Sequence, residues 1–389
     1  MIGLVLSARA LRGFADGCIA VVLPAYLLAL GHRDLEVGLI STATLLGSAC
    51  TTLAVGRWGN RFPLRRLMLA AALLMAATGA GFAGFSSLWP LLMVGFVGTL
   101  NPSSGDASIF MPLDHTMLAT APAGQRTRLF ARYSFVGSAF GALGALAAGT
   151  PEWLAAAGWP LLGALRAMFA VYALVGVAVW LLYLRLPKSP KTEQQPVAAL
   201  THSRAIVWRL AGLFSIDSFA GGLALNSLLA LWLFQRFEMS LAAAGAFFFW
   251  TGVLAAVSQL AAAPLANRVG LVNTMVFTHI PSSLFLIGAA LATRLEVALA
   301  CLLARSLLSQ MDVPARGAFV MSVVTPEERP AAASFTSVPR ALAAAASPSL
   351  TGALFAAGAM AAPLVMCGVL KIAYDVALFA AFRRTETRG

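Results

Sequence analysis

Carboxylate side chains stand inside long apolar stretches of this 389-residue sequence, in which only 11% of the residues are charged. Four of them, Asp16, Asp106, Asp217 and Asp312, lie in four different apolar stretches. A charged side chain in hydrocarbon is costly unless it faces a cavity or a partner, so such residues usually mark an ion or substrate pathway. A carboxyl group in a partly dry cavity also takes up a proton more readily than one in water. The four aspartates are therefore candidates for proton or substrate binding.

Nearby arginines offer a second interpretation, in which the carboxylates only clamp helices together. Arg316 follows Asp312 by one helical turn on the same face, which favours an ion pair for Asp312. Asp106 has no basic residue three or four positions away, so it is the stronger candidate for a proton or substrate site. For Asp16 and Asp217 both interpretations stay open. The arginines considered for such clamps are Arg12, Arg132, Arg316 and Arg340.

Asp114 and His115 form a second polar pair in the same stretch as Asp106. We expect Asp114 to form an ion pair with Arg132 or Arg128 of the next helix. A metal ion is the weaker alternative for Asp114 and His115, because Asp, His and the neighbouring methionines do not form a recognised ligand set. The sequence therefore predicts no metal site.

Two further local patterns carry expectations. The sequence Pro-Ser-Ser-Gly at residues 102–105 weakens the helix just before Asp106 and predicts an interruption that exposes backbone carbonyls. Near the end of the chain, Lys371 and Asp375 are one turn apart, which favours an ion pair between them. The alternatives are that Lys371 extends to the membrane surface or reaches inward.

The elements that must position these residues are membrane helices. Hydrophobic residues make up 60% of the chain and its mean hydropathy is +0.84, whereas soluble domains have roughly 45–50% apolar residues. Apolar stretches of about 20 residues are long enough to cross a bilayer as helices. We predict an all-α polytopic membrane protein with twelve transmembrane spans, at residues 4–30, 37–56, 65–86, 89–118, 128–149, 158–185, 205–233, 241–262, 271–292, 296–322, 331–356 and 361–382.

Basic residues are distributed unevenly between the two sets of loops. If the N-terminus is cytoplasmic, the outer loops hold only Arg33, Arg236 and Arg294, and most other basic loop residues lie inside. This asymmetry places both termini in the cytoplasm. It also accounts for much of the net charge of +12, so we expect no nucleic-acid partner. The four cysteines are scattered singly and predict neither a disulfide nor a zinc site: Cys18, Cys50, Cys301 and Cys367.

The two halves of the sequence are alike at a spacing of about 200 residues. A segment GRWGNRFPLRR follows the second span, APLANRVGLVN follows the eighth, and Asp16 has its counterpart in Asp217. Six spans repeated with one polarity are typical of a transporter built from two parallel halves. We predict a six-helix bundle at residues 1–186, a cytoplasmic linker at 187–204 and a second six-helix bundle at 205–389.

These features together resemble the major facilitator superfamily over essentially the whole chain. The resemblance is to a bacterial permease subgroup of unassigned substrate, which implies a location in the bacterial inner membrane. GRWGNRFPLRR at residues 56–66 is similar to the loop motif that the family carries between its second and third spans, and ANRVG at 266–270 is its echo. The resemblance implies two pseudo-symmetric six-helix bundles, with spans one, four, seven and ten lining a central cavity. It also implies that the motif loop holds one face of the transporter closed. Asn60 and Asn267 replace the usual aspartate of the motif, so the acidic half of that latch is missing.

Two sets of candidate site residues follow from the charges and the resemblance. The cavity set, expected to bind protons or substrate, comprises Asp16, Asp106, Asp217, Asp312, Arg12, Asn226 and Phe110. The gating set, expected to change contacts between conformations, comprises Gly56, Asn60, Arg61, Arg65, Asn267, Arg268, Asp114, Arg132 and Arg316.

The sequence lacks the signatures of common catalytic and nucleotide-binding sites, so we expect no enzyme, no catalytic residues and no cofactor apart from protons as coupling ions. The leading hypothesis is a monomeric secondary transporter that exports an amphipathic or cationic small molecule by proton-coupled alternating access. The alternatives are uptake of an organic anion held by Arg12, Arg132 or Arg340, export of a divalent metal, and a membrane sensor or scaffold that transports nothing.

Overall fold

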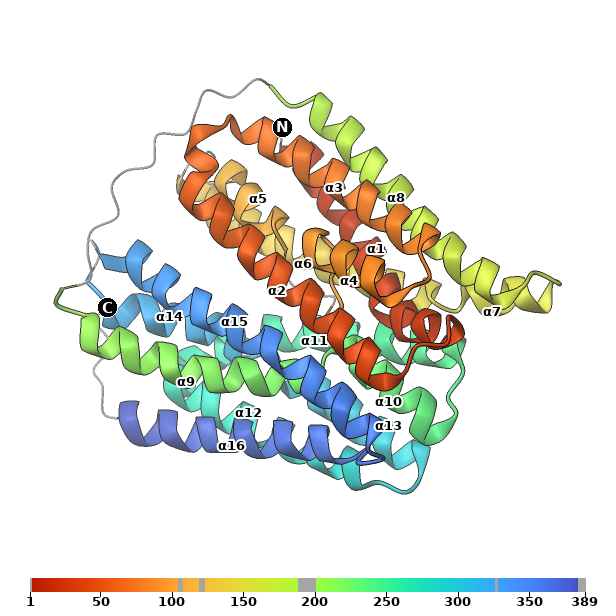
Figure 1. Cartoon of the computed structure of the whole chain (residues 1–389). Coiled ribbons are helices and arrows are strands. Elements are labelled where there is room, and N and C mark those ends of the chain that lie inside the picture. Colours follow the sequence, from red (N-terminus) through yellow and green to blue (C-terminus); the bar gives the residue numbers. More distant parts are fainter. Residues whose placement is uncertain (1, 104–107, 119–122, 188–200, 326–327, 384–389) are drawn as a thin grey trace. The chain divides into compact units, whose positions relative to one another are not determined.

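The computed structural model describes residues 2–103, 108–118, 123–187, 201–325 and 328–383, and within these residues it contains helices and no β-strand (Figure 1). The prediction of an all-α protein is confirmed. The helices of the first half are α1 (Ile2–Ala29), α2 (Asp34–Trp58), the 3-10 turn η1 (Gly59–Arg61), α3 (Leu64–Gly84), α4 (Leu88–Val97), α5 (Phe110–Leu118), α6 (Ala123–Ala147), α7 (Thr150–Ala156) and α8 (Leu161–Leu184). Those of the second half are α9 (Arg204–Leu223), α10 (Asn226–Phe237), α11 (Leu241–Val269), α12 (Leu271–Leu291), α13 (Leu295–Leu308), α14 (Asp312–Val323), α15 (Arg329–Ala356) and α16 (Ala362–Phe382).

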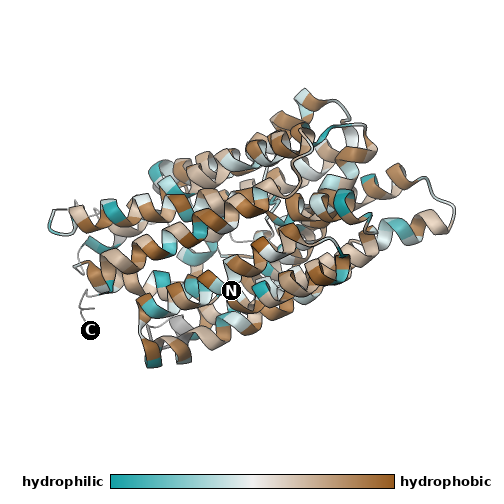
Figure 2. Cartoon of the chain, turned by 90° about the horizontal axis from the view of Figure 1, so that it is seen from below, coloured by the Kyte–Doolittle hydropathy of each residue, from teal (hydrophilic) through white to brown (hydrophobic). Residues whose placement is uncertain are grey.

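Ten helical segments of the described residues are long and apolar enough to cross a membrane. They include the joined pairs at 204–237 and 295–323, and α4 is a shorter apolar helix. Together with the α4 and α5 pair and with α15, these segments are consistent with the twelve spans predicted from the sequence. Figure 2 shows the hydrophobic residues distributed along the helices, as expected for helices that contact lipid as well as protein.

Three of the predicted spans are interrupted near their middle. The fourth stops at Val97 and resumes at Phe110, so the predicted break around Pro102 is confirmed. Pro102 disfavours helical geometry in Asn101, and the Asn101 side-chain oxygen accepts hydrogen bonds from the N–H (3.1 Å) and hydroxyl (2.7 Å) of Ser103. The Pro102 carbonyl, which the break frees, accepts the N–H of Ser227 at 3.1 Å.

The other two interruptions lie at Ala224–Leu225, between α9 and α10, and at 309–311, between α13 and α14. The predicted spans ran through both breaks, although Gly221 and Gly222 precede the first and Pro314 follows the second. The second break makes Asp312 the first residue of α14. A carboxylate at this position is stabilised by the partial positive charge of the helix N-terminus.

The chain forms two compact units, which we describe separately. Unit 1 comprises residues 1–194 and 225–250, and unit 2 comprises residues 195–224 and 251–389. The predicted division into 1–186, 187–204 and 205–389 stays a prediction based on the duplication.

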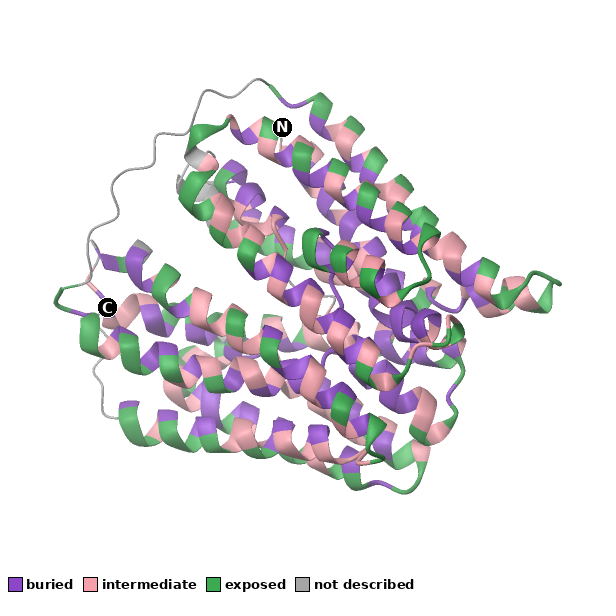
Figure 3. Ribbon diagram, in the orientation of Figure 1, coloured by how far each residue is buried: buried purple, intermediate pink, exposed green. Residues whose placement is uncertain are grey.

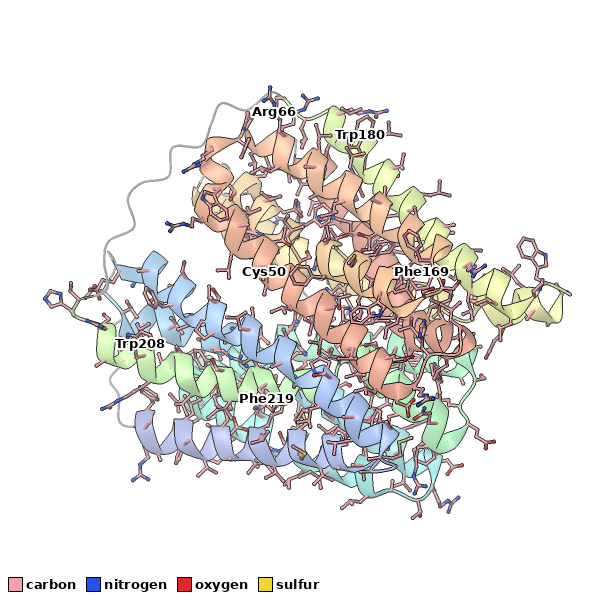
Figure 4. The ribbon with its side chains drawn as sticks, in the orientation of Figure 1. Cys50, Arg66, Phe169, Trp180, Trp208 and Phe219 are labelled. Atoms are coloured by element: carbon pink, nitrogen blue, oxygen red, sulfur yellow. The ribbon has the colours of Figure 1, made fainter. Side chains whose placement is uncertain are left out.

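In unit 1 the main helix pairs are α1 with α6 and α3 with α8. Glycines allow close approach: a Cβ on Gly17 would lie 2.0 Å from the carbonyl oxygen of Gly141. In the second pair, Phe169 of α8, labelled in Figure 4, stacks on Phe82 of α3 with ring centroids 5.3 Å apart. Small residues at such crossings are the common means of packing helices in a membrane, where lipid is as apolar as the side chains.

In unit 2 the corresponding pairs are α9 with α15 and α12 with α16, and α9 also packs against α16. Trp208 near the start of α9, labelled in Figure 4, contacts Phe335 of α15 with ring centroids 6.0 Å apart. The first span pairs with the fifth and the third with the sixth in unit 1, and the same order recurs in unit 2. This agreement supports the duplication inferred from the sequence.

Large apolar side chains are exposed on many helices, among them Trp89 (74%), Leu260 (71%) and Leu174 (67%). Figure 3 shows buried and exposed residues alternating on the sides of single helices. Exposed apolar surface of this extent would be unstable in water. It fits a protein whose outer surface contacts lipid.

Candidate functional site

A cavity of about 420 Å³ lies within unit 2, between α9, α12, α13, α14, α15 and α16. Phe214, Ser218 and Ser282 contribute apolar and hydroxyl surface to its wall. The ionisable side chains in the wall are Asp217, Asp312, His279, Arg305, Arg316, Arg340 and Lys371. This concentration of charge inside one helical unit makes the cavity the candidate functional site.

Asp217 is the centre of the charged network. One of its oxygens accepts a hydrogen bond from the Lys371 ammonium at 2.6 Å, and the other lies 3.0 Å from the Arg316 guanidinium. The Asp217 side chain is 6% exposed, and those of its two partners are 12% and 9% exposed. Asp217 therefore has two cationic partners in a site that solvent barely reaches.

Asp312 binds Arg316 within α14, as the spacing of one turn predicted. Arg316 thus joins the two aspartates of the cavity. Its guanidinium carbon lies 5.4 Å from the centroid of the Phe214 ring, a cation–π contact. We expected Arg316 to act in gating. In this structure it is buried and forms ion pairs with the carboxylates of both α9 and α14.

Lys371 and Asp375 do not pair with each other, so that prediction is wrong. Lys371 turns toward Asp217, and Asp375 binds Nδ1 of His279 at 3.0 and 3.1 Å. The helices α12 and α16 pack side by side, so His279 offers Asp375 a closer partner than the lysine on its own helix. Nε2 of His279 in turn lies 3.3 Å from the Lys371 ammonium.

Arg305 and Arg340 complete the basic wall. Arg340 donates a hydrogen bond to the hydroxyl of Ser218 at 3.2 Å, and its guanidinium lies 5.9 Å from the Phe214 ring centroid. Among the residues that the structure describes, no carboxylate lies within 4.0 Å of a basic nitrogen of Arg305 or Arg340. Both therefore bring positive charge to the cavity that no described acid neutralises directly.

A second buried cluster lies in unit 1 around Asp114. The expected pairing of Asp114 with Arg132 or Arg128 is wrong, because its cationic partner is Arg12 of α1. Asp114 also accepts hydrogen bonds from the hydroxyls of Tyr133 (2.8 Å) and Tyr183 (3.4 Å).

Arg132 is exposed on α6. The sequence correctly indicated that Asp114 pairs with an arginine, but it could not select the helix that supplies it.

The remaining cavity candidates of unit 1 are placed as follows. Asp16 accepts a hydrogen bond from the Tyr172 hydroxyl at 3.4 Å. Phe110 is buried, and the centroid of its ring lies 4.1 Å from the guanidinium carbon of Arg12. Asn226 is the half-buried first residue of α10. Asp106 lies outside the described residues.

His115 contacts the rings of Phe130 and Tyr133 at 5.0 and 5.5 Å between centroids. Among the described residues, no group of three or more His, Cys, Asp or Glu side chains is placed to hold a metal ion.

The motif at residues 56–66 spans the end of α2, the turn η1 and the start of α3. Arg65 donates hydrogen bonds to the carbonyls of Tyr183 (3.3 Å) and Leu184 (2.6 Å) at the end of α8. The Tyr183 carbonyl also accepts the N–H of Leu186 at 3.1 Å, so Arg65 mainly satisfies the Leu184 carbonyl at the helix end. The other motif residues, Gly56, Arg61, Asn267 and Arg268, are exposed, and the side chain of Asn60 lies outside the description.

Two ionisable residues with several contacts escaped the sequence reasoning. His279 lies inside an apolar span, and the rule that marks intramembrane charges as functional applied to it as well. Glu328, before α15, accepts hydrogen bonds from the N–H groups of Thr201 (2.6 Å), His202 (3.0 Å) and Ser203 (2.9 Å). Hydrogen bonds from Thr201 and Ser203 hold the pKa of Glu328 well below its usual range. No local pattern indicated this contact, because 125 positions separate Ser203 and Glu328.

Comparison with known proteins identifies the fold. The model of the Major Facilitator Superfamily matches residues 5–304. An uncharacterized membrane protein of Saccharomyces cerevisiae is 22% identical over an aligned length of 416 residues. The alignment covers 97% of this chain and 93% of that protein. The xylose transporter XylE from E. coli, in its inward open conformation, superposes with a TM-score of 0.76 at 15% identity, covering 100% of this chain and 98% of XylE.

The human organic anion transporter MFSD10 is likewise similar, with a TM-score of 0.65 at 18% identity over 97% of this chain and 98% of that one. The fold is thus that of membrane transporters. The chain belongs to the Major Facilitator Superfamily and is a multi-pass membrane transporter of a small molecule.

Proposed function

We propose that this protein transports a small organic anion and that the cavity of unit 2 binds the anionic group. The observation that carries the proposal is the charge of the cavity wall. Arg305 and Arg340 face a cavity of about 420 Å³ without a carboxylate partner among the described residues. Guanidinium groups present several donors in a planar array that matches a carboxylate or phosphate.

The acids of the same wall are less suited to bind a cation. Asp217 and Asp312 already have Lys371 and Arg316 as partners. A cationic substrate would have to displace one of these partners. Export of a cationic compound, the leading hypothesis from the sequence, therefore has less support in unit 2 than the organic-anion alternative. Of the three arginines named for that alternative, Arg340 is the one in this cavity.

The comparison proteins do not select the substrate. One is named as a xylose transporter and another as an organic anion transporter, and at such low identity they share only the fold with this chain. The support for an anion comes from the side chains of this chain.

We further propose that transport is coupled to protons and proceeds by alternating access, with residues 1–186 moving against residues 205–389. The buried ionisable network of unit 2 supports proton coupling, since such groups inside membrane helices usually serve ion pathways. The distribution of basic loop residues supports an inner-membrane location with both termini cytoplasmic.

The proposal is tested by ligand-dependent thermal stabilisation of the purified full-length protein. A ligand that binds only the folded state stabilises it by about 2.7 kcal/mol at 100 times its Kd. The panel contains benzoate, succinate and phenyl phosphate as anions and tetraphenylphosphonium as a cation. We expect at least one anion to raise the unfolding temperature.

The matched variants are Arg340→Gln and Arg294→Gln. Both lose one positive charge, but Arg294 is 77% exposed and lies outside the cavity. We expect Arg340→Gln to abolish the stabilisation by the anion and Arg294→Gln to retain it. Stabilisation by tetraphenylphosphonium alone, or equal loss in both variants, would contradict an anion site in unit 2.

A further inference from the structure

His279 occupies a position between an acid and a base in the cavity wall. Its Nδ1 lies 3.0 and 3.1 Å from the two oxygens of Asp375, and its Nε2 lies 3.3 Å from the Lys371 ammonium. The side chains of His279 and Asp375 are 4% and 0% exposed. The imidazole therefore connects a fully buried carboxylate to a lysine that borders the cavity.

The partners of the two ring nitrogens determine which nitrogen of His279 carries a hydrogen. An ammonium can only donate, so Nε2 must accept from Lys371 through its lone pair. A carboxylate can only accept, so Nδ1 carries the hydrogen and donates it to Asp375. The arrangement is that of a neutral imidazole protonated at Nδ1.

A proton added to His279 is incompatible with this arrangement. It can bind only at Nε2, where the lone pair becomes an N–H bond that faces the ammonium of Lys371. Two donors with positive charge would then lie 3.3 Å apart. The new N–H has an alternative acceptor in the Asp217 oxygen, at 3.9 Å from Nε2, which is the oxygen that Lys371 now binds.

We propose that His279 is the proton-binding residue of this cavity and that its protonation releases Lys371 from Asp217. The proton comes from solvent in the cavity and remains on Nε2, and the imidazolium takes the place of the ammonium at Asp217. Lys371 belongs to the cavity wall, so its freed ammonium becomes a third cation for an anionic substrate, beside Arg305 and Arg340.

The other charged and titratable groups around His279 do not reverse this consequence. The helices packed on α12 are α13, α14 and α16, and α9 and α15 border the same cavity. Three acids surround His279, namely Asp217 of α9, Asp312 of α14 and Asp375 of α16. Four basic side chains surround it as well, namely Arg305 of α13, Arg316 of α14, Arg340 of α15 and Lys371 of α16. The centroid of the Tyr374 ring lies 6.1 Å from that of the imidazole. A proton on His279 therefore adds to a net positive site, and an anion in the cavity offsets the added charge.

This inference rests on the proposed anion transport and predicts how the two ligands are coupled. A proton on His279 frees a cation for the substrate, so it strengthens anion binding. Linkage requires that the anion strengthen proton binding by the same factor. Binding of both together and release of both together is the behaviour of a symporter, and a factor of about 5 to 150 is typical of such coupling.

The switch itself can be tested without a substrate. The chain contains four histidines and three lysines, and Lys371 is the only lysine outside the predicted linker. The full-length protein, labelled with 15N-histidine and 15N-lysine in lipid nanodiscs, is followed by NMR from pH 8.5 to 4.5, with His279→Gln and Lys371→Arg to assign the signals. We expect Nε2 of His279 to change from an unprotonated to a protonated signal, and the Lys371 Nζ signal to move over the same pH range.

Variants separate the switch from a general effect of pH. In His279→Gln, the Lys371 signal is expected to stay constant where it moves in the wild type. In Asp375→Asn, the loss of the neighbouring negative charge is expected to make His279 take up its proton at lower pH. This second variant keeps the test valid if His279→Gln does not fold. A His279 that stays neutral throughout, or a Lys371 signal that moves equally in His279→Gln, would overturn the proposal.

The coupling to substrate is measured with benzoate, succinate and phenyl phosphate at pH 5.5 and 8.0. We expect any anion that binds to bind about 5 to 150 times more tightly at the lower pH, and this ratio to fall to about 1 in His279→Gln. An unchanged ratio in that variant would overturn the coupling. If none of the three anions binds, the proposed function fails, and the NMR titration still decides on the switch.

Discussion

Replacing Asp114 by Asn would leave the charge of Arg12 buried without a counterion at this position. The side chains of Arg12 and Asp114 are 2% and 0% exposed, and an amide of the same shape accepts a hydrogen bond without neutralising the guanidinium. Removing one partner of a buried pair costs about 3–5 kcal/mol. Each kcal/mol lowers Tm by about 2–4 °C for a unit of about 150–250 residues, so Asp114→Asn should lower Tm by roughly 6–20 °C.

The measurement uses the cysteines of the chain as reporters. Cys18 of α1 and Cys367 of α16 are buried, whereas Cys50 is exposed and Cys301 is half-buried. After the accessible thiols have reacted, the further rise in fluorescence of a thiol-reactive dye on heating reports when either unit opens. The full-length protein in detergent is compared with Asp114→Asn and with Glu296→Gln. The side chain of Glu296 is 75% exposed, and the loss of its surface ion pair should cost at most about 1 kcal/mol.

A double variant distinguishes the ion pair from other effects of the substitution. Arg12→Met combined with Asp114→Leu removes both charges, and apolar replacement of a buried pair is often neutral. The double variant should therefore be more stable than Asp114→Asn alone. The reasoning is refuted if Asp114→Asn shifts Tm no more than Glu296→Gln does, or if the double variant is the least stable of the three.

Two further predictions follow from packing and from hydrogen bonding. Gly17→Ala places a Cβ 2.0 Å from the carbonyl oxygen of Gly141 and should cost about 1–3 kcal/mol. Gly3→Ala on the same helix, where a Cβ meets nothing within 4 Å, should not lower Tm, and equal Tm losses would show that the α1–α6 contact is not tight. Folding lowers the pKa of Glu328, so its carboxylate stabilises the fold above the ordinary carboxyl pKa and loses this effect as the pH falls through the folded-state pKa. Glu328→Gln should therefore speed amide hydrogen exchange at residues 201–203 at pH 7. The difference from the wild type should shrink in acid, and unchanged exchange at pH 7 would count against the contact.

Much of the fold could be predicted because hydropathy is a local property of the chain. The apolar stretches, the repeated order of the two halves and the break at Pro102 were all evident in the sequence, and the structure agrees with them. The breaks before Leu225 and Asp312 were not evident. Weak helix formers do flank both breaks, Gly221 and Gly222 before the first and Pro314 after the second, but each break lies inside a longer apolar stretch that was predicted as one span.

The residue types of the candidate site could be predicted, but its contacts between different helices could not. Asp217, Asp312 and Arg340 were named from their charge, and they share one cavity. His279 was not among the predicted site residues, although it is an ionisable residue in a predicted span. Asp106 stays a prediction, since it lies outside the described residues.

The sequence by itself determined the ion pair of Asp312 with Arg316, since both lie one turn apart on one helix. Only the tertiary structure decided that Asp114 binds Arg12, 102 positions away, and that Lys371 binds Asp217, 154 positions away. The periodicity of a helix specifies neighbours within a turn. Partners on different helices depend on how each helix is rotated and shifted against the next, which is set by close contacts such as that of α1 with α6 and has no local signature in the sequence.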